Sequence, residues 1–365
     1  MLYEIDFLPV GDGEKSGDAI SLRYSSDGGN RWTIGVIDGG TQESGEALLE
    51  HIPKYYGSMN VDFVICTHPE QDHASGLSII LDKLNVSQVL MHRPWEHIDQ
   101  IYPFVTDGRV SKESLRKRLI NGHPYAYALQ EKASEKGIPI YEPFSNSYFS
   151  IIPNLTILGP SLGYYLSCLC NFRSITEATV DINRGPLEAL RRMASKTVNW
   201  INETWDDEKL VEPVDDKVSS ENNSGVISMF TFGENKVLLT ADVGVPALSQ
   251  AINYANSRGI VLGGISLFQA PHHGSKRNLG PSVLDKLLGP KRKKGNLPEY
   301  NVFISTSKET DPKHPSKRVV NALIRRGAKV IVTQGSTKRH YSPEMPDRGW
   351  QDATPLPFYN QVEVD

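Results

Sequence analysis

The feature that most constrains the fold is a series of short apolar runs rich in β-branched and aromatic residues. The runs cover residues 5–10, 32–38, 62–68, 86–92, 154–160, 225–232, 235–242, 265–273, 301–307 and 328–335. Most are bounded by Gly, Pro, Asn or Asp, as is typical of β-strands in a globular protein. The sequence therefore predicts a chain built around β-sheet.

Helical patterns lie between some of these runs. Apolar side chains recur on one face in the segments 43–57, 75–85 and 315–328, and Gly327 provides a stop for the last. Strands and helices alternate only loosely, and several strands follow one another as pairs. This pattern favours an α/β (α+β) fold in which two sheets pack face to face with helices outside, over a doubly wound parallel sheet.

Two segments interrupt this order. Residues 110–136 are charged and helical in pattern, whereas residues 161–215 mix Tyr, Cys and Trp and end in an acidic stretch. A chain of 365 residues is long enough for one large layered domain or two average ones. Because strand-like runs resume on either side, we interpret both segments as insertions in a single domain that spans residues 1–365.

Composition narrows the class of protein. No apolar run approaches the ~20 residues that cross a bilayer, and the N-terminus carries acids where a signal peptide carries basic residues. The cysteines Cys66, Cys168 and Cys170 are too few for a disulfide framework. We expect a cytoplasmic protein that does not insert into membranes.

Charge is distributed unevenly along the chain. The net charge is −4, yet residues 273–340 contain 16 Lys/Arg and 4 Asp/Glu. This window therefore carries +12, and the remainder carries −16. A basic segment in an acidic protein indicates an anionic ligand such as a phosphate, although the "KRKKG" stretch at 291–295 is equally typical of a solvated loop.

Several strand-like runs end in a residue that can bind metal. Asp38, His68 and Asp242 each close a run, and His272 and His273 close another. Buried Asp is rare without a partner, and packing alone does not require these residue types. If the strand ends meet at one edge, a divalent metal ion explains their presence. The stretch 68–73, with four ionisable groups in six positions, belongs to the same pattern.

The motifs that carry these residues resemble those of a known superfamily. "THPEQDH", "LLTADVG" and "APHHGS", in that order, are similar to the metallo-β-lactamase superfamily, and most closely to the soluble hydrolase domain of ComEC-type DNA-uptake proteins and their free-standing relatives. "GDAISLRY", "ENNSGVISMF" and "KHPSKRVVNALIRRGA" match the same pattern. The resemblance covers most of the chain. It implies a four-layer αββα sandwich with helical insertions.

The resemblance also implies a metal-ligand set. His68 is expected to bind a first ion, Asp72 and His73 a second, and Asp242 both. Either His272 or His273 completes the second site, and adjacent histidines cannot be told apart by sequence. Glu70 is a further candidate ligand, with a solvated loop carboxylate as the alternative.

The chain departs from the common superfamily pattern at two positions. Glu70 stands where a second histidine is usual, and the segment 222–224 stands where a later metal-binding histidine is usual. Oxygen donors suit harder ions, so Zn²⁺, Mn²⁺ and Mg²⁺ are all candidates for one or two bound divalent ions.

Other residues receive supporting roles from the same resemblance. Asp38 is expected to orient the ligands, and Asp72 to hold the nucleophile as well as a metal. His314 and Lys276 are candidates to meet charge on a phosphoryl oxygen. Further candidates near the substrate are Asn223, Ser224 and Ser275. His92, His97 and His123 have no partners at ligand spacing and receive no role.

These features lead to three functional hypotheses. The first is a metal-dependent phosphodiesterase or nuclease whose substrate is nucleic acid or a nucleotide. The second is a hydrolase of a small-molecule ester, lactam or thioester, because an activated hydroxide also attacks carbonyl carbon. The third is a metal-bound component without activity of its own, which docks a protein partner through the insertions.

Overall fold

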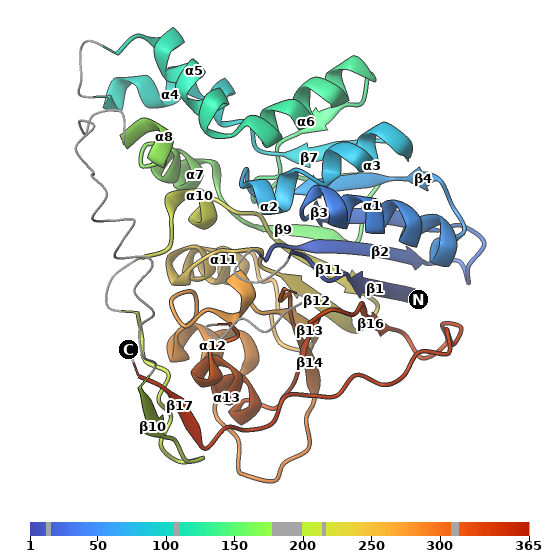
Figure 1. Ribbon diagram of the computed structural model, residues 1–365, viewed down its shortest axis with the longest axis vertical. Coiled ribbons are helices and arrows are strands. Elements are labelled where there is room, and N and C mark those ends of the chain that lie inside the picture. Colours follow the sequence, from blue (N-terminus) through green and yellow to red (C-terminus); the bar gives the residue numbers. More distant parts are fainter. Residues whose placement is uncertain (12–15, 106–109, 177–198, 214–216, 308–313, 365) are drawn as a thin grey trace.

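The computed structural model describes residues 1–11, 16–105, 110–176, 199–213, 217–307 and 314–364. Two large β-sheets form the centre of the molecule (Figure 1). The first has seven strands in the order β16-β1-β2-β3-β5-β7-β8. Its strands are β1 (Leu2–Phe7), β2 (Ala19–Ser25), β3 (Thr33–Gly39), β5 (Phe63–Cys66), β7 (Val89–Met91), β8 (Ile140–Tyr141) and β16 (Lys338–Tyr341).

The second sheet has six strands in the order β15-β14-β13-β12-β11-β9. They are β9 (Leu155–Gly159), β11 (Ile227–Phe232), β12 (Asn235–Leu239), β13 (Ile265–Gln269), β14 (Tyr300–Ile304) and β15 (Ala328–Val332). In each sheet an antiparallel part leads into a parallel part: β3, β5 and β7 in the first, and β12 to β15 in the second. Two short pairs, β4 (Asn60–Val61) with β6 (Asn85–Val86) and β10 (Trp200–Asn202) with β17 (Gln361–Glu363), lie outside the large sheets.

Helices cover the outer face of each sheet. On the first sheet these are α1 (Gln42–His51), α2 (Gln71–Ala74), α3 (Leu77–Lys83), α4 (Ile98–Ile101), α5 (Lys112–Gly122), α6 (Pro124–Glu135), α7 (Leu162–Leu169) and α8 (Arg173–Thr176). On the second they are α11 (Val245–Ser257), α12 (Pro281–Leu288) and α13 (Lys317–Arg325), with the short α10 (Ser220–Asn223) near the sheet edge. A π-helical turn at Ile52–Tyr56 continues α1, and 3₁₀ turns lie at Pro94–Glu96, Tyr102–Phe104 and His272–Gly274.

Three apolar cores separate the layers. Side chains such as Phe7, Ile65, Phe230 and Phe303 fill the space between the two sheets. A second core joins the first sheet to its helices, and a third joins the other sheet to α11, α12 and α13. In Figure 1 the helices lie on the outer sides of the paired sheets. The four-layer αββα sandwich is thus confirmed.

Each predicted strand run contains a strand, and the predicted helices correspond to α1, α3 and α13. The segment 110–136 forms α5 and α6. The segment 161–215 contributes α7, α8 and β10, while its residues 177–198 and 214–215 lie outside the described part of the chain. Among the helices of the described residues, none combines the length and apolar character that a membrane crossing requires.

Candidate metal centre

The carboxyl ends of the parallel strands from both sheets meet at one edge of the sandwich. Asp38 lies at the end of β3 and His68 follows β5, whereas Asp242 follows β12 and His272 and His273 follow β13. One backbone hydrogen bond across the sheets, from Val226 N to Thr67 O at 3.0 Å, ties the end of β5 to the start of β11. Both sheets therefore contribute to one buried group of side chains. We refer to Asp18, Asp38, His68, Asp72, His73, Asp242, His272 and His273 as the His/Asp cluster.

Asp38 organises the side of the cluster formed by the first sheet. Its Oδ1 accepts a hydrogen bond from Thr67 N at 2.8 Å, and its Oδ2 accepts from Thr67 Oγ1 at 2.6 Å. The same Oδ2 lies 2.8 Å from Nδ1 of His73, and Thr67 Oγ1 lies 3.0 Å from Nδ1 of His68. A histidine whose Nδ1 is held in this way presents Nε2 as its free ligand atom. Asp38 thus holds the imidazole of His73 directly and that of His68 through Thr67.

The Nε2 atoms of His68 and His73 are buried and have no hydrogen-bond partner among the described residues. His68 is 2% exposed and His73 is fully buried. Buried polar atoms are normally paired, so such atoms indicate a missing ligand. The ring centroids of the two histidines lie 4.1 Å apart, which places both side chains at the same point of the cluster.

The loop that carries Gly17 and Asp18 packs closely against the backbone of Asp72. Asp72 lies in the first turn of α2, directly before His73. A Cβ at Gly17 would lie 1.9 Å from the carbonyl oxygen of Asp72, so this approach requires glycine. The neighbouring loop can thereby bring Asp18 beside His73, with Asp18 Oδ2 3.9 Å from His73 Nδ1.

Asp242 is the central residue among those that the second sheet contributes to the His/Asp cluster. Its Oδ2 lies 2.5 Å from Nδ1 of His272, 3.6 Å from Nε2 of His73 and 3.9 Å from Nε2 of His273. Its Oδ1 is buried and lacks a hydrogen-bond partner within the described residues. One carboxylate therefore contacts or approaches three imidazoles, the arrangement expected of a bridging ligand.

The two adjacent histidines have different surroundings. His273 is buried, and its Nδ1 lies 2.9 Å from the carbonyl oxygen of Ser305, a contact that leaves Nε2 free to face Asp242. The side chain of His272 is 35% exposed, and its Nδ1 is engaged by Asp242 and lies 3.2 Å from Nδ2 of Asn222. The geometry thus favours His273 as the histidine whose free nitrogen faces the cluster.

Asp18 is a member of the cluster that the sequence analysis missed. It is buried, and its Oδ2 accepts a hydrogen bond from Nε2 of Gln269 at 2.7 Å. Gln269 Oε1 in turn accepts from the backbone N–H groups of Thr240 and Ala241, just before Asp242. Asp18 Oδ1 is left without a partner in the described part of the chain. A charged residue immediately before an apolar strand, in "GDAISL", was the available signal.

Backbone strain is concentrated at this edge. Asp38, Ala241, His272 and His273 adopt φ angles of 54°, 47°, 46° and 57°. Such left-handed conformations cost non-glycine residues on the order of 1–3 kcal/mol each. Only two other non-glycine residues of the described chain, Asn146 and Gln334, share this property. Strain of this kind is characteristic of functional sites, where side chains are held in set directions.

The donor set fits a divalent metal ion. Three overlapping groups have ligand atoms within 4.8 Å of one another: Asp72, His73 and His273; Asp242, His272 and His273; and Asp18, His73 and Asp242. A further group joins His68 to His73 and Asp38. Imidazole and carboxylate groups at these separations suit Zn²⁺ and Mn²⁺. A bound cation would also provide a partner for the buried atoms that lack one. The cluster thus has the composition of a divalent-metal site.

Electrostatics within the cluster agree with this interpretation. Burial lowers the pKa of His68 and that of His273 to about 4, so both imidazoles are neutral and can act as ligands. Burial also lowers the pKa of His73, but the charges of Asp242 and Asp38 more than reverse the effect and raise it well above its usual value.

The other predicted residues lie in several environments. The His314 ring lies 6.2 Å from that of His272 and 6.4 Å from that of His273, at the rim of the cluster. Lys276 Nζ lies 3.5 Å from the backbone oxygen of Val364. The remaining three contact backbone: Asn223 accepts from Gly244 N, Ser224 Oγ donates to Glu221 O, and Ser275 Oγ accepts from Arg277 N. Glu70 forms an ion pair with Arg173.

Many side chains of the basic 273–340 segment do not face the cluster. Arg325 pairs with Glu203, and Arg326 with Glu208 and Asp285. Three more pairs are Lys291–Glu208, Arg292–Glu299 and Arg339–Glu4. These contacts hold the segment 199–213 and the N-terminal strand in place. These five basic residues of the window are therefore partnered by carboxylates of the protein itself, which lowers the charge they can offer an anionic ligand.

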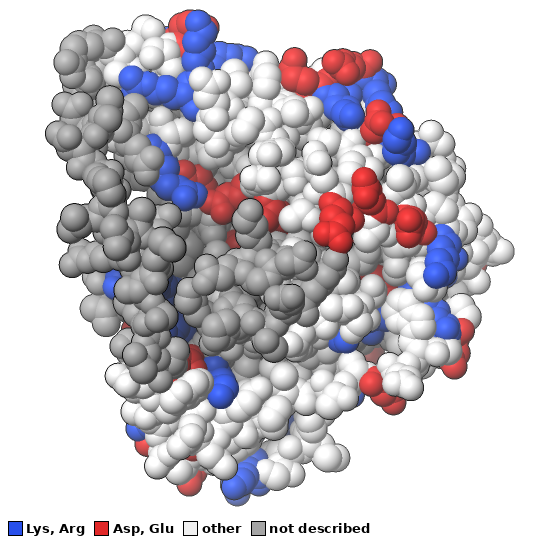
Figure 2. All heavy atoms as spheres, in the orientation of Figure 1, with Lys and Arg blue, Asp and Glu red and all other residues white. Residues whose placement is uncertain are grey.

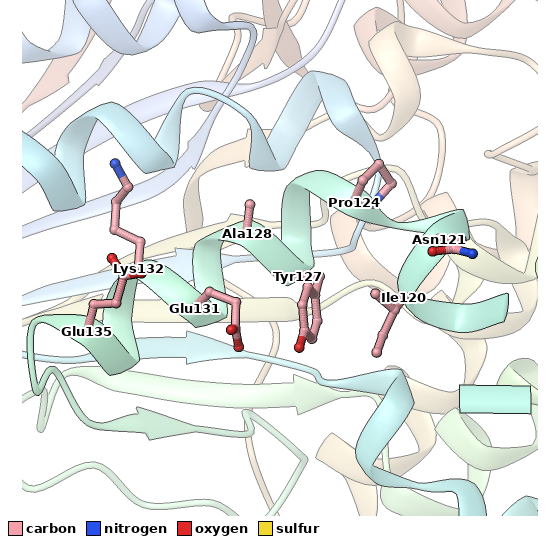
Figure 3. Close-up of a pocket in the computed structure, with 8 residues that line it drawn as sticks. All are labelled: Ile120, Asn121, Pro124, Tyr127, Ala128, Glu131, Lys132 and Glu135. Carbon is pink, nitrogen blue, oxygen red and sulfur yellow. The ribbon is translucent and has the colours of Figure 1, made fainter. Parts of the chain in front are cut away.

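One surface depression of the described residues, about 610 Å³ in volume, lies away from the cluster. It is formed by α5 and α6, and Figure 3 shows Tyr127, Glu131 and Lys132 among its lining side chains. A second, of about 370 Å³, includes Gln71 and Ser75, which flank Asp72 and His73. The smaller depression is thus the one that adjoins the cluster.

Comparison with solved structures finds distant similarities. A diphosphatase of the PhnP family is 12% identical with a TM-score of 0.36, and the match covers 93% of this chain and 99% of that one. A protein of Thermotoga maritima assigned as a metallo-β-lactamase is 12% identical with a TM-score of 0.32, covering 71% and 86%. Metallo-β-lactamase SMB-1, bound to 2-mercaptoethanesulfonate, is 10% identical with a TM-score of 0.30, covering 78% and 86%.

The chain is a four-layer αββα sandwich with the His/Asp cluster at its strand ends, the layer order that the resemblance to the metallo-β-lactamase superfamily implied. No protein-family model and no curated protein matches the sequence. At 10–12% identity and TM-scores of 0.30–0.36 the solved structures assign no activity, so any activity has to be argued from the cluster.

Proposed function

We propose that the chain is a metal-dependent hydrolase whose active site is the His/Asp cluster. The observation that carries the proposal is the convergence of buried, unpartnered ligand atoms, His68 Nε2, His73 Nε2 and Asp242 Oδ1, at the ends of strands from two sheets. With Asp72 and His273 they form the ligand set that we propose for one or two divalent ions. A divalent ion at such a site supplies Lewis acidity and makes water nucleophilic near neutral pH.

The protein groups around the ligands have separable roles in this proposal. Asp38 holds His73 through Nδ1 and so fixes the direction of its Nε2. Asp242 spans the cluster, and Asp72 orients the attacking water. His314, at the rim beside His272, is placed to donate a proton or hydrogen bond to a developing oxyanion. Lys276 remains a weaker candidate for the same role, because its ammonium approaches the chain's C-terminal end.

We further propose that the preferred substrates are phosphodiesters, such as nucleic acid or a nucleotide. Support comes from the resemblance of "THPEQDH", "LLTADVG" and "APHHGS" to the ComEC-type hydrolase domain, and from the carboxylates Asp72 and Asp242 in the ligand set, since oxygen donors suit ions used in phosphoryl chemistry. The internal ion pairs of the 273–340 segment reduce the support from charge. A short oligonucleotide or nucleotide therefore fits better than a long duplex.

A carbonyl substrate is the second candidate. The observation that favours it is the pairing of Arg325, Arg326 and Arg339 with internal carboxylates, which removes them as partners for a phosphate backbone. Such an enzyme would hydrolyse uncharged esters at rates that salt hardly changes, whereas cleavage of a polyanion is slowed by salt.

Hydrolysis assays after metal removal test both candidates. Stripped protein is reloaded with Zn²⁺, Mn²⁺ or Mg²⁺ and given single-stranded DNA, single-stranded RNA, bis(p-nitrophenyl) phosphate and p-nitrophenyl acetate. Asp72→Ala serves as the active-site variant, and Asp352→Ala, at an exposed aspartate, as its matched control. We expect metal-restored cleavage of a phosphodiester by the wild type and the control only.

The pattern of failure discriminates among the hypotheses. Turnover of the acetate ester alone would replace the phosphodiester proposal with the carbonyl one. Stoichiometric metal binding without turnover of any substrate would contradict an autonomous hydrolase and favour a partner-dependent component.

A further inference from the structure

The two sides of the His/Asp cluster are unequally equipped for metal binding. Asp72, His73, Asp242 and His273 belong to groups that share ligand atoms, and Asp18 adds a further carboxylate. His68 is grouped only with Asp38 and His73 in the described chain. Both oxygens of Asp38 are already engaged by Thr67 and His73. The side around His68 thus has few donors for an ion of its own.

A basic side chain pairs with Glu70, which stands two residues after His68 in the sequence. Arg173, at the start of α8, forms an ion pair with Glu70 through Nη2. Its Nε lies 3.4 Å from Oε1 of Glu221, and its backbone N–H donates to the same oxygen at 2.7 Å. Glu70 is contributed by the start of α2 and Glu221 by α10. Figure 2 shows basic and acidic side chains side by side on this face of the molecule.

The two carboxylates need a cation. The side chain of Glu221 is 1% exposed and that of Glu70 is 26% exposed. A buried carboxylate is costly unless a positive charge or hydrogen bonds compensate it. Arg173 is close enough to do this for both. The guanidinium therefore supplies Glu70 and Glu221 with positive charge that a metal ion would otherwise provide.

We infer that Arg173 replaces a first metal ion and that the chain holds a single divalent ion, bound by Asp72, His73, Asp242 and His273. This inference rests on the proposed metal-dependent function and makes it more specific. Glu70 is then an ion-pair partner of Arg173 and not a ligand. His68 contributes an imidazole beside the ion, and the positive charge on its far side comes from the protein.

Counting bound ions tests the inference without an activity assay. Native mass spectrometry and calorimetric titration of the stripped full chain with Zn²⁺ and Mn²⁺ give the number of ions and their affinity. We expect one tightly bound ion per chain. Two ions in the wild type would overturn the inference while leaving the proposed hydrolase intact, whereas no bound ion would contradict the proposed function itself.

Substitutions at the ion pair sharpen the test. Glu70→Gln should retain one ion and change its Kd by less than about fivefold, the range of a partly exposed ion pair. Asp72→Asn should weaken binding by about tenfold or more. A loss of comparable size in Glu70→Gln would make Glu70 a ligand and overturn the inference.

Arg173 itself is tested by a matched pair of variants. Arg173→Ala frees Glu70 and Glu221, so a second, weaker ion should bind. Arg173→Lys keeps the positive charge and should still hold one. If Arg173→Ala, shown by circular dichroism to be folded, binds a single ion as the wild type does, the guanidinium does not stand in for a metal.

Discussion

Two clusters of buried charge in the molecule meet the cost of burial in different ways. We call Glu4, Asp6, Arg23, Arg339 and Arg348 the arginine cluster. Glu4 and Asp6 lie on β1 with fully buried side chains, on the face opposite to Ile5 and Phe7. Here the cations are supplied by the protein, whereas the His/Asp cluster at the strand ends retains unpartnered atoms within the described residues.

The pairing in the arginine cluster is complete on the carboxylate side. Glu4 Oε1 lies 2.6 Å from Nε of Arg23, and Glu4 Oε2 lies 2.7 Å from Nη2 of Arg348. Asp6 Oδ1 lies 3.0 Å from Nη1 of Arg348, and Asp6 Oδ2 accepts from the hydroxyl of Tyr56 at 2.7 Å. The Arg348 guanidinium also lies over the rings of Tyr55 and Trp350. A buried cluster of this kind stabilises structure, whereas one that lacks positive charge indicates a ligand.

The largest expected effect is at the His/Asp cluster. Asp242→Asn keeps the side-chain shape but removes the charge that approaches three histidines, so we expect hydrolysis to fall by about 10⁴-fold, as when a member of a catalytic unit is lost. Wild-type protein should gain about 2.7 kcal/mol of unfolding free energy at an ion concentration of 100 Kd. The variant should gain little at the same concentration. Equal stabilisation of both by metal would remove Asp242 from the ligand set.

Substitutions in the arginine cluster should change the stability of the protein but not its metal affinity. Arg348→Met leaves Glu4 and Asp6 short of a partner, and we expect a loss of about 3–5 kcal/mol of unfolding free energy, the cost of breaking a buried pair. Urea denaturation measures it, with Arg31→Met at an exposed arginine as the control. Metal affinity of the folded variant should be unchanged. A weaker affinity would show that the two clusters are coupled.

Glycine at position 17 links packing to the metal centre. In Gly17→Ala the new Cβ would meet the carbonyl oxygen of Asp72 at 1.9 Å, so the loop has to move. We expect a loss of about 1–3 kcal/mol in stability, as in other overpacked sites, together with weaker metal binding because Asp18 and Asp72 shift. Gly57→Ala, where nothing lies within 4 Å of the added Cβ, is the control for the open surface, although its positive φ also adds strain. Unchanged metal affinity in Gly17→Ala would contradict this coupling.

The smallest expected effect is a loss of stability at acidic pH. Burial raises the pKa of Asp6, but His51, Arg348 and Tyr56 outweigh it and hold the pKa below the ordinary value of 3.8. The unfolded chain therefore binds the proton first, and the stability due to Asp6 is present above that value and is lost as the pH falls through the folded pKa. For one proton the slope is at most about 1.4 kcal/mol per pH unit.

Comparing metal-free wild type with Asp6→Asn isolates this contribution. Between roughly pH 5 and pH 3, around the ordinary pKa of an aspartate, the unfolding free energy of the wild type should decline more steeply than that of Asp6→Asn. Parallel curves for the two proteins would show that Asp6 keeps the same pKa on unfolding.

Local patterns in the sequence were sufficient for the architecture and for several residues of the His/Asp cluster. Apolar runs bounded by turn residues predicted the strands, because side-chain periodicity and turn chemistry act over a few residues. The same runs ended in Asp38, His68 and Asp242, and parallel strands bring such ends to one sheet edge. The ComEC-type resemblance and the ligand assignments remain predictions that metal binding has to test.

Partners distant in sequence were decided only by the tertiary structure. Asp18 meets Gln269 from 251 residues away, and Arg173 meets Glu70 from 103 residues away. The choice of His273 over His272 as the inward-facing histidine depends on a backbone oxygen at Ser305. Sequence counts also place the basic residues in one window, but packing directs many of them to buried carboxylates. The physical reason is that a buried charge is costly unless an opposite charge or hydrogen bonds compensate it. The packing of the layers decides which residue is near enough to do so.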